Sequence, residues 1–119
     1  MKLYGIANCD TVKKARRFLD EAGVAYTFHD YKKMGVDKAA LRAQVAEFGW
    51  EKILNTRGTT WRKQPDTVKA ATTSEAAAID LMLAEPSIIK RPIVEAEGRR
   101  LLGFDPTAWE IALAAGELK

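Results

Sequence analysis

The chain contains a single cysteine, Cys9, within the stretch YGIANCDTVKKA at residues 4–15. An apolar run precedes Cys9 and the start of an amphipathic helix follows it, so we expect it at the carboxyl end of a strand, where α/β sheets commonly bind ligands. A helix beginning near Asp10 presents unpaired backbone N–H groups and the positive end of its dipole to the sulfur, which favours thiolate over thiol. This position favours a nucleophilic cysteine over an inert one that only packs.

The neighbours of Cys9 differ in whether they favour the thiolate form of the sulfur. Thr11 could add a hydroxyl hydrogen bond, and Asn8 could orient the loop through its amide or form a plain turn. The carboxylate of Asp10 disfavours the thiolate unless it turns inward to cap the helix, and the sequence leaves both orientations open. Val12 stands where a C-x-x-C motif carries its second cysteine. Any disulfide cycle at Cys9 therefore needs a thiol from another molecule.

Composition limits the other kinds of chemistry. With one cysteine and one histidine, the chain cannot form a zinc site unless carboxylates are recruited, so we expect no metal. The histidine, His29, is interpreted as an edge or surface residue rather than a catalytic base. The net charge of +3 comes from 19 basic and 16 acidic side chains. The densest basic cluster, in residues 13–17, has no interleaved aromatic residues to stack on bases, so we expect no nucleic acid partner.

The first part of the sequence predicts the elements that position Cys9. Strand-forming residues occur at 2–6, and apolar and polar side chains alternate at 25–31. Between them, apolar residues at helical spacing predict a helix that ends at Gly23. The crossover has the length that a right-handed parallel pairing of the two strands needs. The prediction is a strand-helix-strand unit with Cys9 at its first junction.

The middle of the chain, residues 32–87, is predicted to be mostly helical. One helix is expected up to the stop signal FGW, and the polar segment 55–66 is expected to be a loop. Thr72 and Glu75 match a capping box at the start of a further helix, which Pro86 ends. We interpret this region as a helical insert.

Strand signals return after the insert. Residues 93–95 and 100–102 predict a hairpin. Asp105 is the expected cap of a last helix, and Phe104 and Trp109 have the spacing of a hydrophobic staple. The order β-α-β, helical insert, β-β-α predicts an α/β fold with a thioredoxin-like mixed sheet.

The whole chain is expected to form one domain, with the thioredoxin-like part at residues 1–31 and 88–119. The N-terminus lacks the apolar core of a signal peptide, and no stretch has the roughly 18 apolar residues of a membrane span. We therefore expect a cytoplasmic protein without a membrane partner, acting as a monomer.

Four motifs in a fixed order give the chain a resemblance to a known family. They are YGIANCDTVKKA, ILNTRGTTWRK, KRPIV and GFDPTAWE. Over essentially the whole chain, they resemble the arsenate reductase (ArsC) and Spx family of thioredoxin-like proteins, and most closely its small YffB-like members.

The resemblance implies that Cys9 is the redox-active or nucleophilic thiol, that Arg57 and Arg91 belong to an anion-binding pocket, and that Pro92 is the cis-proline of thioredoxin-like folds. Two guanidinium groups near one sulfur would stabilise a thiolate and bind an oxyanion or carboxylate through paired N–H donors. We therefore expect a glutathione-dependent monothiol oxidoreductase, with no bound cofactor. Its thiol donor would be glutathione or a glutaredoxin-like protein, and its substrate a small oxyanion or a disulfide.

Two departures from the family pattern bear on the alternatives. Gly103 stands where arsenate reductases of this family carry a further arginine, which weighs against arsenate reduction. Spx-type regulators commonly have a C-x-x-C switch and bind RNA polymerase, whereas this chain lacks the second cysteine. The alternatives are a non-catalytic adaptor that binds RNA polymerase or another protein, and an arsenate reductase.

Overall fold

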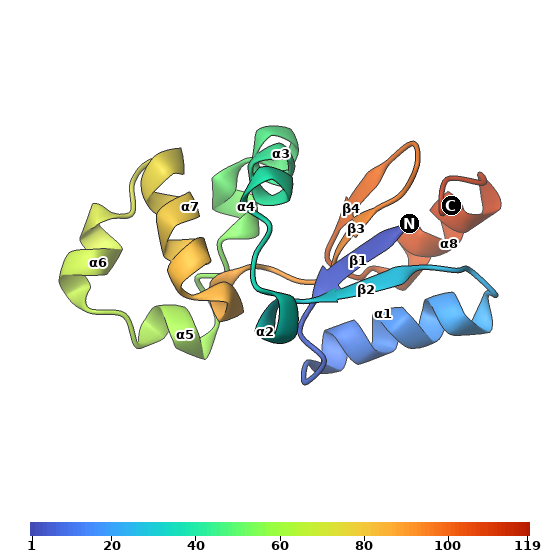
Figure 1. Cartoon of the computed structure of the whole chain (residues 1–119), viewed down its shortest axis with the longest axis horizontal. Coiled ribbons are helices and arrows are strands. Elements are labelled where there is room, and N and C mark those ends of the chain that lie inside the picture. Colours follow the sequence, from blue (N-terminus) through green and yellow to red (C-terminus); the bar gives the residue numbers. More distant parts are fainter. The chain divides into compact units, whose positions relative to one another are not determined.

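The structure, a computed structural model, describes residues 1–119. The chain divides into two compact units, one formed by Met1–Met34 with Arg91–Lys119 and the other by Gly35–Lys90. The second unit begins and ends a few residues later in the chain than the predicted insert, residues 32–87. The first unit carries the sheet and is called the sheet unit below; the second is called the helical unit (Figure 1).

The sheet unit contains four strands in the order β2-β1-β3-β4. Their bounds are Lys2–Gly5 for β1, Thr27–Asp30 for β2, Ile93–Glu95 for β3 and Arg100–Leu102 for β4. β1 pairs in parallel with β2 and antiparallel with β3, and β3 pairs antiparallel with β4. The mixed sheet, the strand-helix-strand crossover and the hairpin of β3 and β4 confirm the predicted α/β fold class.

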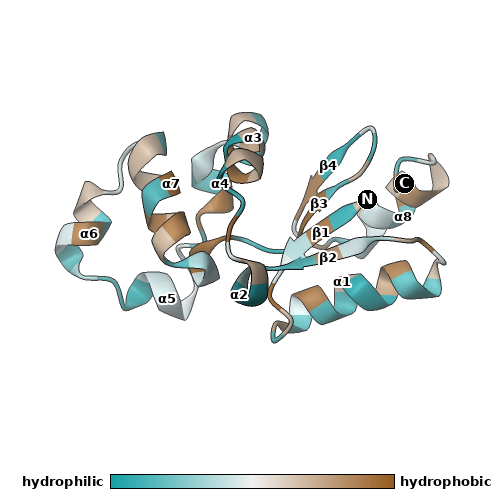
Figure 2. Cartoon of the chain, viewed as in Figure 1, coloured by the Kyte–Doolittle hydropathy of each residue, from teal (hydrophilic) through white to brown (hydrophobic).

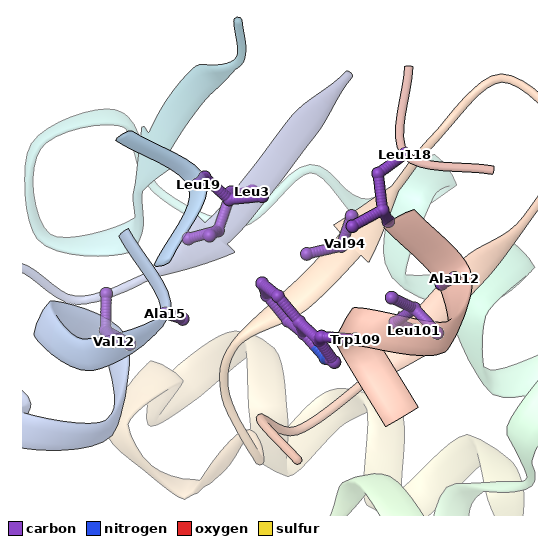
Figure 3. Packing of buried hydrophobic residues seen from close by; sticks show 9 residues of the cluster. All are labelled: Leu3, Val12, Ala15, Leu19, Val94, Leu101, Trp109, Ala112 and Leu118. Atoms are coloured by element: carbon purple, nitrogen blue, oxygen red, sulfur yellow. The ribbon is translucent and has the colours of Figure 1, made fainter. Parts of the chain in front are cut away.

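Helices α1 and α8 cover one face of this sheet. Their bounds are Asp10–Glu21 and Pro106–Ala114. Leu3, Val94 and Leu101 form one row across β1, β3 and β4, so their side chains point to the same face. They form the core of the sheet unit with Trp109, which is 1% exposed, and with residues of both helices (Figure 3). Figure 2 shows that α1 presents hydrophilic residues between its hydrophobic ones, as expected for a helix with one face on the core.

The last helix, α8, begins as predicted. Asp105 is its cap, and one carboxylate oxygen accepts hydrogen bonds from two backbone N–H groups of the first turn at 3.1 and 3.5 Å. The rings of Phe104 and Trp109 lie 4.8 Å apart and perpendicular, which confirms the staple. The indole Nε1 of Trp109 donates to the carbonyl of Gly103 at 3.2 Å. The one polar atom of this large core residue therefore has a partner.

The helical unit contains five α-helices and a short 3-10 helix. Their bounds are Lys38–Phe48 for α3, Trp50–Ile53 for α4, Thr59–Arg62 for α5, Asp66–Ala71 for α6, Glu75–Ala84 for α7 and Pro86–Ile88 for η1. The segment 55–66, predicted as a loop, is thus partly helical, because α5 forms a helical turn within it. None of the helices in the protein is long and apolar enough to cross a membrane.

The predicted capping box at the start of α7 is wrong. The cap is Ser74, whose hydroxyl oxygen accepts a hydrogen bond from the N–H of Ala77 at 3.2 Å. Thr72 instead ends α6, and its hydroxyl donates to the carbonyl of Val68 at 2.7 Å. A threonine that bonds back to its own helix is not available to cap the next one.

Strand β2 is shorter than the predicted 25–31, because Tyr31 begins helix α2 (Tyr31–Met34). A carboxylate oxygen of Asp30 accepts a hydrogen bond from the N–H of Lys32 at 2.9 Å and closes the turn that ends the strand. His29 lies on this edge strand but is buried, with 8% of its surface exposed. The expectation of an edge residue is therefore confirmed and that of a surface residue is wrong, because two tyrosine rings pack against the imidazole.

Candidate functional site

Cys9 occupies the position directly before helix α1. Its backbone is extended, and its carbonyl accepts the first helical hydrogen bond, from the N–H of Lys13 at 2.9 Å. The N–H groups of the first turn point back toward this end of the helix without helical acceptors. The side chain of Cys9 makes no capping hydrogen bond and is partly exposed. A thiolate at this position lies beside the positive end of a helix of 12 residues.

A close approach of strand and helix fixes the connection that carries Cys9. A Cβ atom on Gly5, at the end of β1, would lie 2.8 Å from Cγ2 of Val12 and 3.3 Å from its Cγ1. Val12 is fully buried in the core beneath α1. Only glycine lets β1 and the first turn of α1 approach this closely, so Gly5 and Val12 together determine the path of the loop between them.

The polar neighbours of Cys9 are all exposed. Asp10 is the first residue of α1, and Cys9 itself holds the cap position, so Asp10 does not cap the helix. Its carboxylate adds negative charge at the end of the helix that favours anions. Asn8 lies in the loop and Thr11 in the first helical turn. Their assignment to the site stays a prediction.

Arg91 and Pro92 directly precede β3 and are joined by a cis peptide bond. Pro92 directly precedes Ile93, the first residue of β3, which pairs with Tyr4 near the end of β1. The end of β1, which leads to Cys9, and the start of β3 therefore lie at the same edge of the sheet. The sheet unit thus brings the segments of Cys9, Arg91 and Pro92 to one edge.

Gly103 follows β4 and has a structural role of its own. Its N–H donates to the carbonyl of Pro92 at 2.8 Å, and the residue is buried. Its φ of 75° lies in the left-handed region, where side chains other than that of glycine are strained. The backbone at this position therefore suits glycine rather than the further arginine of arsenate reductases.

Arg57 lies in the helical unit, between α4 and α5, and is exposed. The side-chain oxygen of Asn55 accepts a hydrogen bond from the N–H of Arg57 at 3.1 Å and closes a local turn. Gly58 completes this turn, because a Cβ atom there would lie 2.9 Å from the amide nitrogen of Asn55. The turn holds the backbone that presents Arg57. Its place beside Cys9 stays a prediction from the family resemblance.

A short antiparallel bridge anchors the Arg57 segment within the helical unit. Leu54 pairs with Ile89, and backbone hydrogen bonds of 2.7 and 2.8 Å flank the pair. Arg57 follows one side of the bridge by three residues, and Arg91 follows the other by two. The same bridge therefore constrains the backbone that leads to each arginine.

The buried Tyr31 interacts electrostatically with Arg91 and is not identified by the sequence pattern. Burial raises the pKa of Tyr31, the charges of Tyr4 and Glu95 raise it further, and the positive charge of Arg91 lowers it. These interactions place Tyr31 within electrostatic reach of Arg91. The alternation of apolar and polar residues at 25–31 indicates which residues of that segment share a face. It does not indicate which residues from other segments lie close to Tyr31.

Comparison with known proteins identifies relatives of the chain. The sequence pattern of the ArsC family matches residues 4–112. An uncharacterized protein of Haemophilus influenzae is 38% identical over 112 residues, which cover 94% of this chain and 97% of that protein. A global transcriptional regulator Spx of Streptococcus agalactiae is 30% identical over 106 residues, which cover 87% of this chain and 75% of that protein.

Solved structures of related proteins also resemble this chain. A protein named YFFB is 53% identical and superposes with a TM-score of 0.88 over 99% of this chain and 98% of that chain. An arsenate reductase (ArsC) related protein from Brucella melitensis is 46% identical, with a TM-score of 0.73 over 94% of this chain and 92% of that chain. These likenesses confirm the predicted thioredoxin-like fold. The chain belongs to the ArsC family.

Proposed function

We propose that the protein is a glutathione-dependent monothiol oxidoreductase with Cys9 as its nucleophile. The observation that carries the proposal is the position of the chain's one cysteine, partly exposed at the N-terminus of α1. Backbone N–H groups and the helix dipole favour a thiolate there. Membership of the ArsC family supports thiol chemistry, and the absence of a second cysteine supports an external thiol as the reductant.

The reaction is a cycle of thiol exchange. The Cys9 thiolate attacks the glutathionyl sulfur of a mixed disulfide, a new S–S bond forms between Cys9 and glutathione, and the other sulfur of the disulfide leaves as a thiolate. A glutathione thiolate then attacks the glutathionyl sulfur, which releases the Cys9 thiolate and forms glutathione disulfide. With a small oxyanion as the substrate, two glutathione molecules supply the two electrons, and water and glutathione disulfide are the other products. The protein needs no bound cofactor for either reaction.

We assign Arg57 and Arg91 to the negative charge of the substrate, a carboxylate of glutathione or an oxyanion. The family resemblance supports both residues, and the position of the Arg91 segment at the edge reached by β1 supports Arg91 in addition. A guanidinium donates paired N–H groups that a lysine cannot supply. Replacement of either arginine by lysine is expected to raise KM for a mixed disulfide of glutathione about tenfold, since hydrogen bonds to charged groups contribute about 1.5–3 kcal/mol. Asn8 and Thr11 are proposed to assist at the loop and the helix N-terminus.

The test is direct modification of the chain by glutathione disulfide. Mass spectrometry of the wild-type protein is expected to show one added glutathionyl group, because the chain has one cysteine. Reduced glutathione should then remove it. Cys9→Ser, with an unchanged circular dichroism spectrum, is the control and should gain nothing. A wild-type chain that forms no mixed disulfide would contradict the proposal.

The likeness to Spx favours a second candidate, an adaptor that binds RNA polymerase or another protein without catalysis. Cys9→Ser separates the two candidates. Binding to immobilised RNA polymerase should survive that substitution if the protein is an adaptor, whereas turnover of a glutathione disulfide should not survive it if the protein is an oxidoreductase.

Arsenate reduction is the third candidate, which the likeness to the Brucella melitensis protein suggests. The left-handed backbone of Gly103 weighs against it. An assay with arsenate, glutathione and glutaredoxin is expected to show no turnover above that of Cys9→Ser.

A further inference from the structure

Arg16 of helix α1 is held in place by two aromatic side chains. Its Nε donates a hydrogen bond to the hydroxyl of Tyr26 at 3.1 Å. The central carbon of its guanidinium group lies 4.1 Å from the centre of the Phe28 ring. All three residues are partly buried. The hydrogen bond and the cation-π contact together restrict a side chain that otherwise has many rotamers.

These contacts leave the outer end of the guanidinium available to a ligand. An arginine has five N–H donors, and the hydrogen bond to Tyr26 uses one of them. The two Nη groups make no hydrogen bond or ion pair within the protein. Asp20 follows Arg16 by four residues, the spacing of a helical ion pair, but the two form none. Arg16 therefore presents a fixed pair of donors to which this chain supplies no carboxylate.

Arg16 lies on the face of α1 that begins with Cys9. Residues four and seven apart share one face of a helix, and Lys13 and Arg16 follow the cap residue Cys9 at these two spacings. Lys13 is exposed, and its side chain forms no ion pair. The rise of a helix over seven residues is about 10 Å. Two positive charges thus follow Cys9 along one face, and the second is about 10 Å from it along the helix axis.

We propose that Arg16 binds an acidic side chain of a glutathionylated protein substrate. The inference rests on the proposed function, in which Cys9 takes the glutathionyl group from a mixed disulfide. The paired N–H donors of a guanidinium match the two oxygens of a carboxylate. An extended chain rises about 3.3 Å per residue, so an acidic residue three positions from the modified cysteine spans the distance from Cys9 to Arg16. Because β2 is an edge strand, no further strand covers Arg16 on that side.

Two glutathionylated peptides test this role. Each contains one cysteine in a disulfide with glutathione, and the third residue on either side of it is glutamate in one peptide and glutamine in the other. The Cys9 thiolate attacks the glutathionyl sulfur, a Cys9–glutathione disulfide forms, and the peptide leaves as a thiolate, which mass spectrometry follows. Below saturation, the wild-type protein is expected to react about fivefold faster with the glutamate peptide, the upper end for an exposed charge pair.

Substitutions of Arg16 should reduce this preference for glutamate. Arg16→Gln removes the charge and should abolish most of the preference. Arg16→Lys keeps the charge without the paired donors, and it should also lose most of the preference. The ratio of two rates in one variant cancels any effect of the substitution on Cys9 itself. The matched control is Arg17→Gln, because Arg17 is the next residue of α1, is exposed and carries the same charge; this variant should keep the wild-type preference.

The possible outcomes separate the inference from the proposed function. Equal wild-type rates with the two peptides, or an equal loss of preference in Arg16→Gln and Arg17→Gln, would overturn the role of Arg16 while Cys9 still reacts. If Arg16→Gln slows both peptides by the same factor, the site binds a carboxylate of glutathione, and an acidic protein is the wrong occupant. A wild-type protein that takes no glutathionyl group from either peptide would instead contradict the proposed function.

Discussion

A cysteine becomes a strong nucleophile only when its thiolate is stabilised, and this protein offers Cys9 a helix end for that purpose. The cap position places the sulfur beside the backbone N–H groups of the first turn of α1. The chain's one imidazole, that of His29, is buried between tyrosine rings on the other face of the sheet. At the scale of single residues, we therefore propose that backbone dipoles and arginine charge, rather than a histidine base, activate Cys9.

The raised pKa of Tyr31 predicts that the free energy of unfolding falls at high pH. Burial raises its pKa above the usual value of about 10. Above that pH the unfolded chain loses the phenol proton while the folded chain retains it, so the free energy of unfolding falls as pH rises. The contribution is fully present below about pH 10 and is lost as pH rises toward the folded pKa. Urea unfolding at about pH 8 and pH 11 should show a smaller fall for Tyr31→Phe than for the wild type, and equal falls would contradict this reading.

The junction of β1 and α1 is the element on which the site depends. Its geometry comes from Gly5 lying against Val12 in the core. We expect Gly5→Ala to destabilise the protein by about 1–3 kcal/mol, the usual cost of overpacking, and to slow alkylation of Cys9. Urea unfolding measures the first effect.

A double-mutant cycle provides the control for that prediction. Val12→Ala removes the methyl groups that the new Cβ would meet. The cost of Gly5→Ala should therefore be smaller in the Val12→Ala background than in the wild type. Equal costs in both backgrounds would show that the close approach does not determine the junction.

The cap of α8 gives a second prediction for an element. Asp105→Ala removes the acceptor of two backbone hydrogen bonds, and it should lower the free energy of unfolding by about 1 kcal/mol. Asp105→Asn keeps an oxygen acceptor and is the matched control, expected to stay near the wild type. Thermal or urea unfolding measures both, and a loss of the same size in the two variants would assign the effect to charge instead of capping.

Elements with local signals could be predicted from the sequence, and those set by tertiary contacts could not. The hairpin and the Asp105 cap depend on neighbouring residues, so their patterns were sufficient. Thr72 carries a correct capping residue type, but the end of α6 uses its hydroxyl. His29 is buried because it pairs with Tyr4 of β1, a strand more than 20 residues earlier, and the ring of Tyr31 packs against both rings. The alternation of apolar and polar residues contains no information about that pairing, so the burial of His29 could not be predicted from it.

At the scale of the whole molecule, the charge of the chain bears on its substrate. The net charge is +3, and the proposed substrates are anions that two arginines bind. Salt screens such attraction, with a Debye length of about 10 Å at 0.1 M ionic strength. The rate of Cys9 glutathionylation should therefore fall severalfold between low and high salt.

A neutral disulfide is the control for this salt effect. Hydroxyethyl disulfide carries no charge, so its rate with Cys9 should change little over the same range of salt. If the rates of the two disulfides with Cys9, measured by mass spectrometry, depend equally on salt, then electrostatic attraction does not contribute to the reaction with glutathione disulfide.

The proposed role of Cys9 as the nucleophile is tested most directly by its rate of alkylation with iodoacetamide at neutral pH. We predict a second-order rate constant clearly above that of free glutathione under the same conditions, because backbone N–H groups at a helix N-terminus favour the nucleophilic form of the sulfur. A rate constant equal to or below that of glutathione would contradict this role of Cys9.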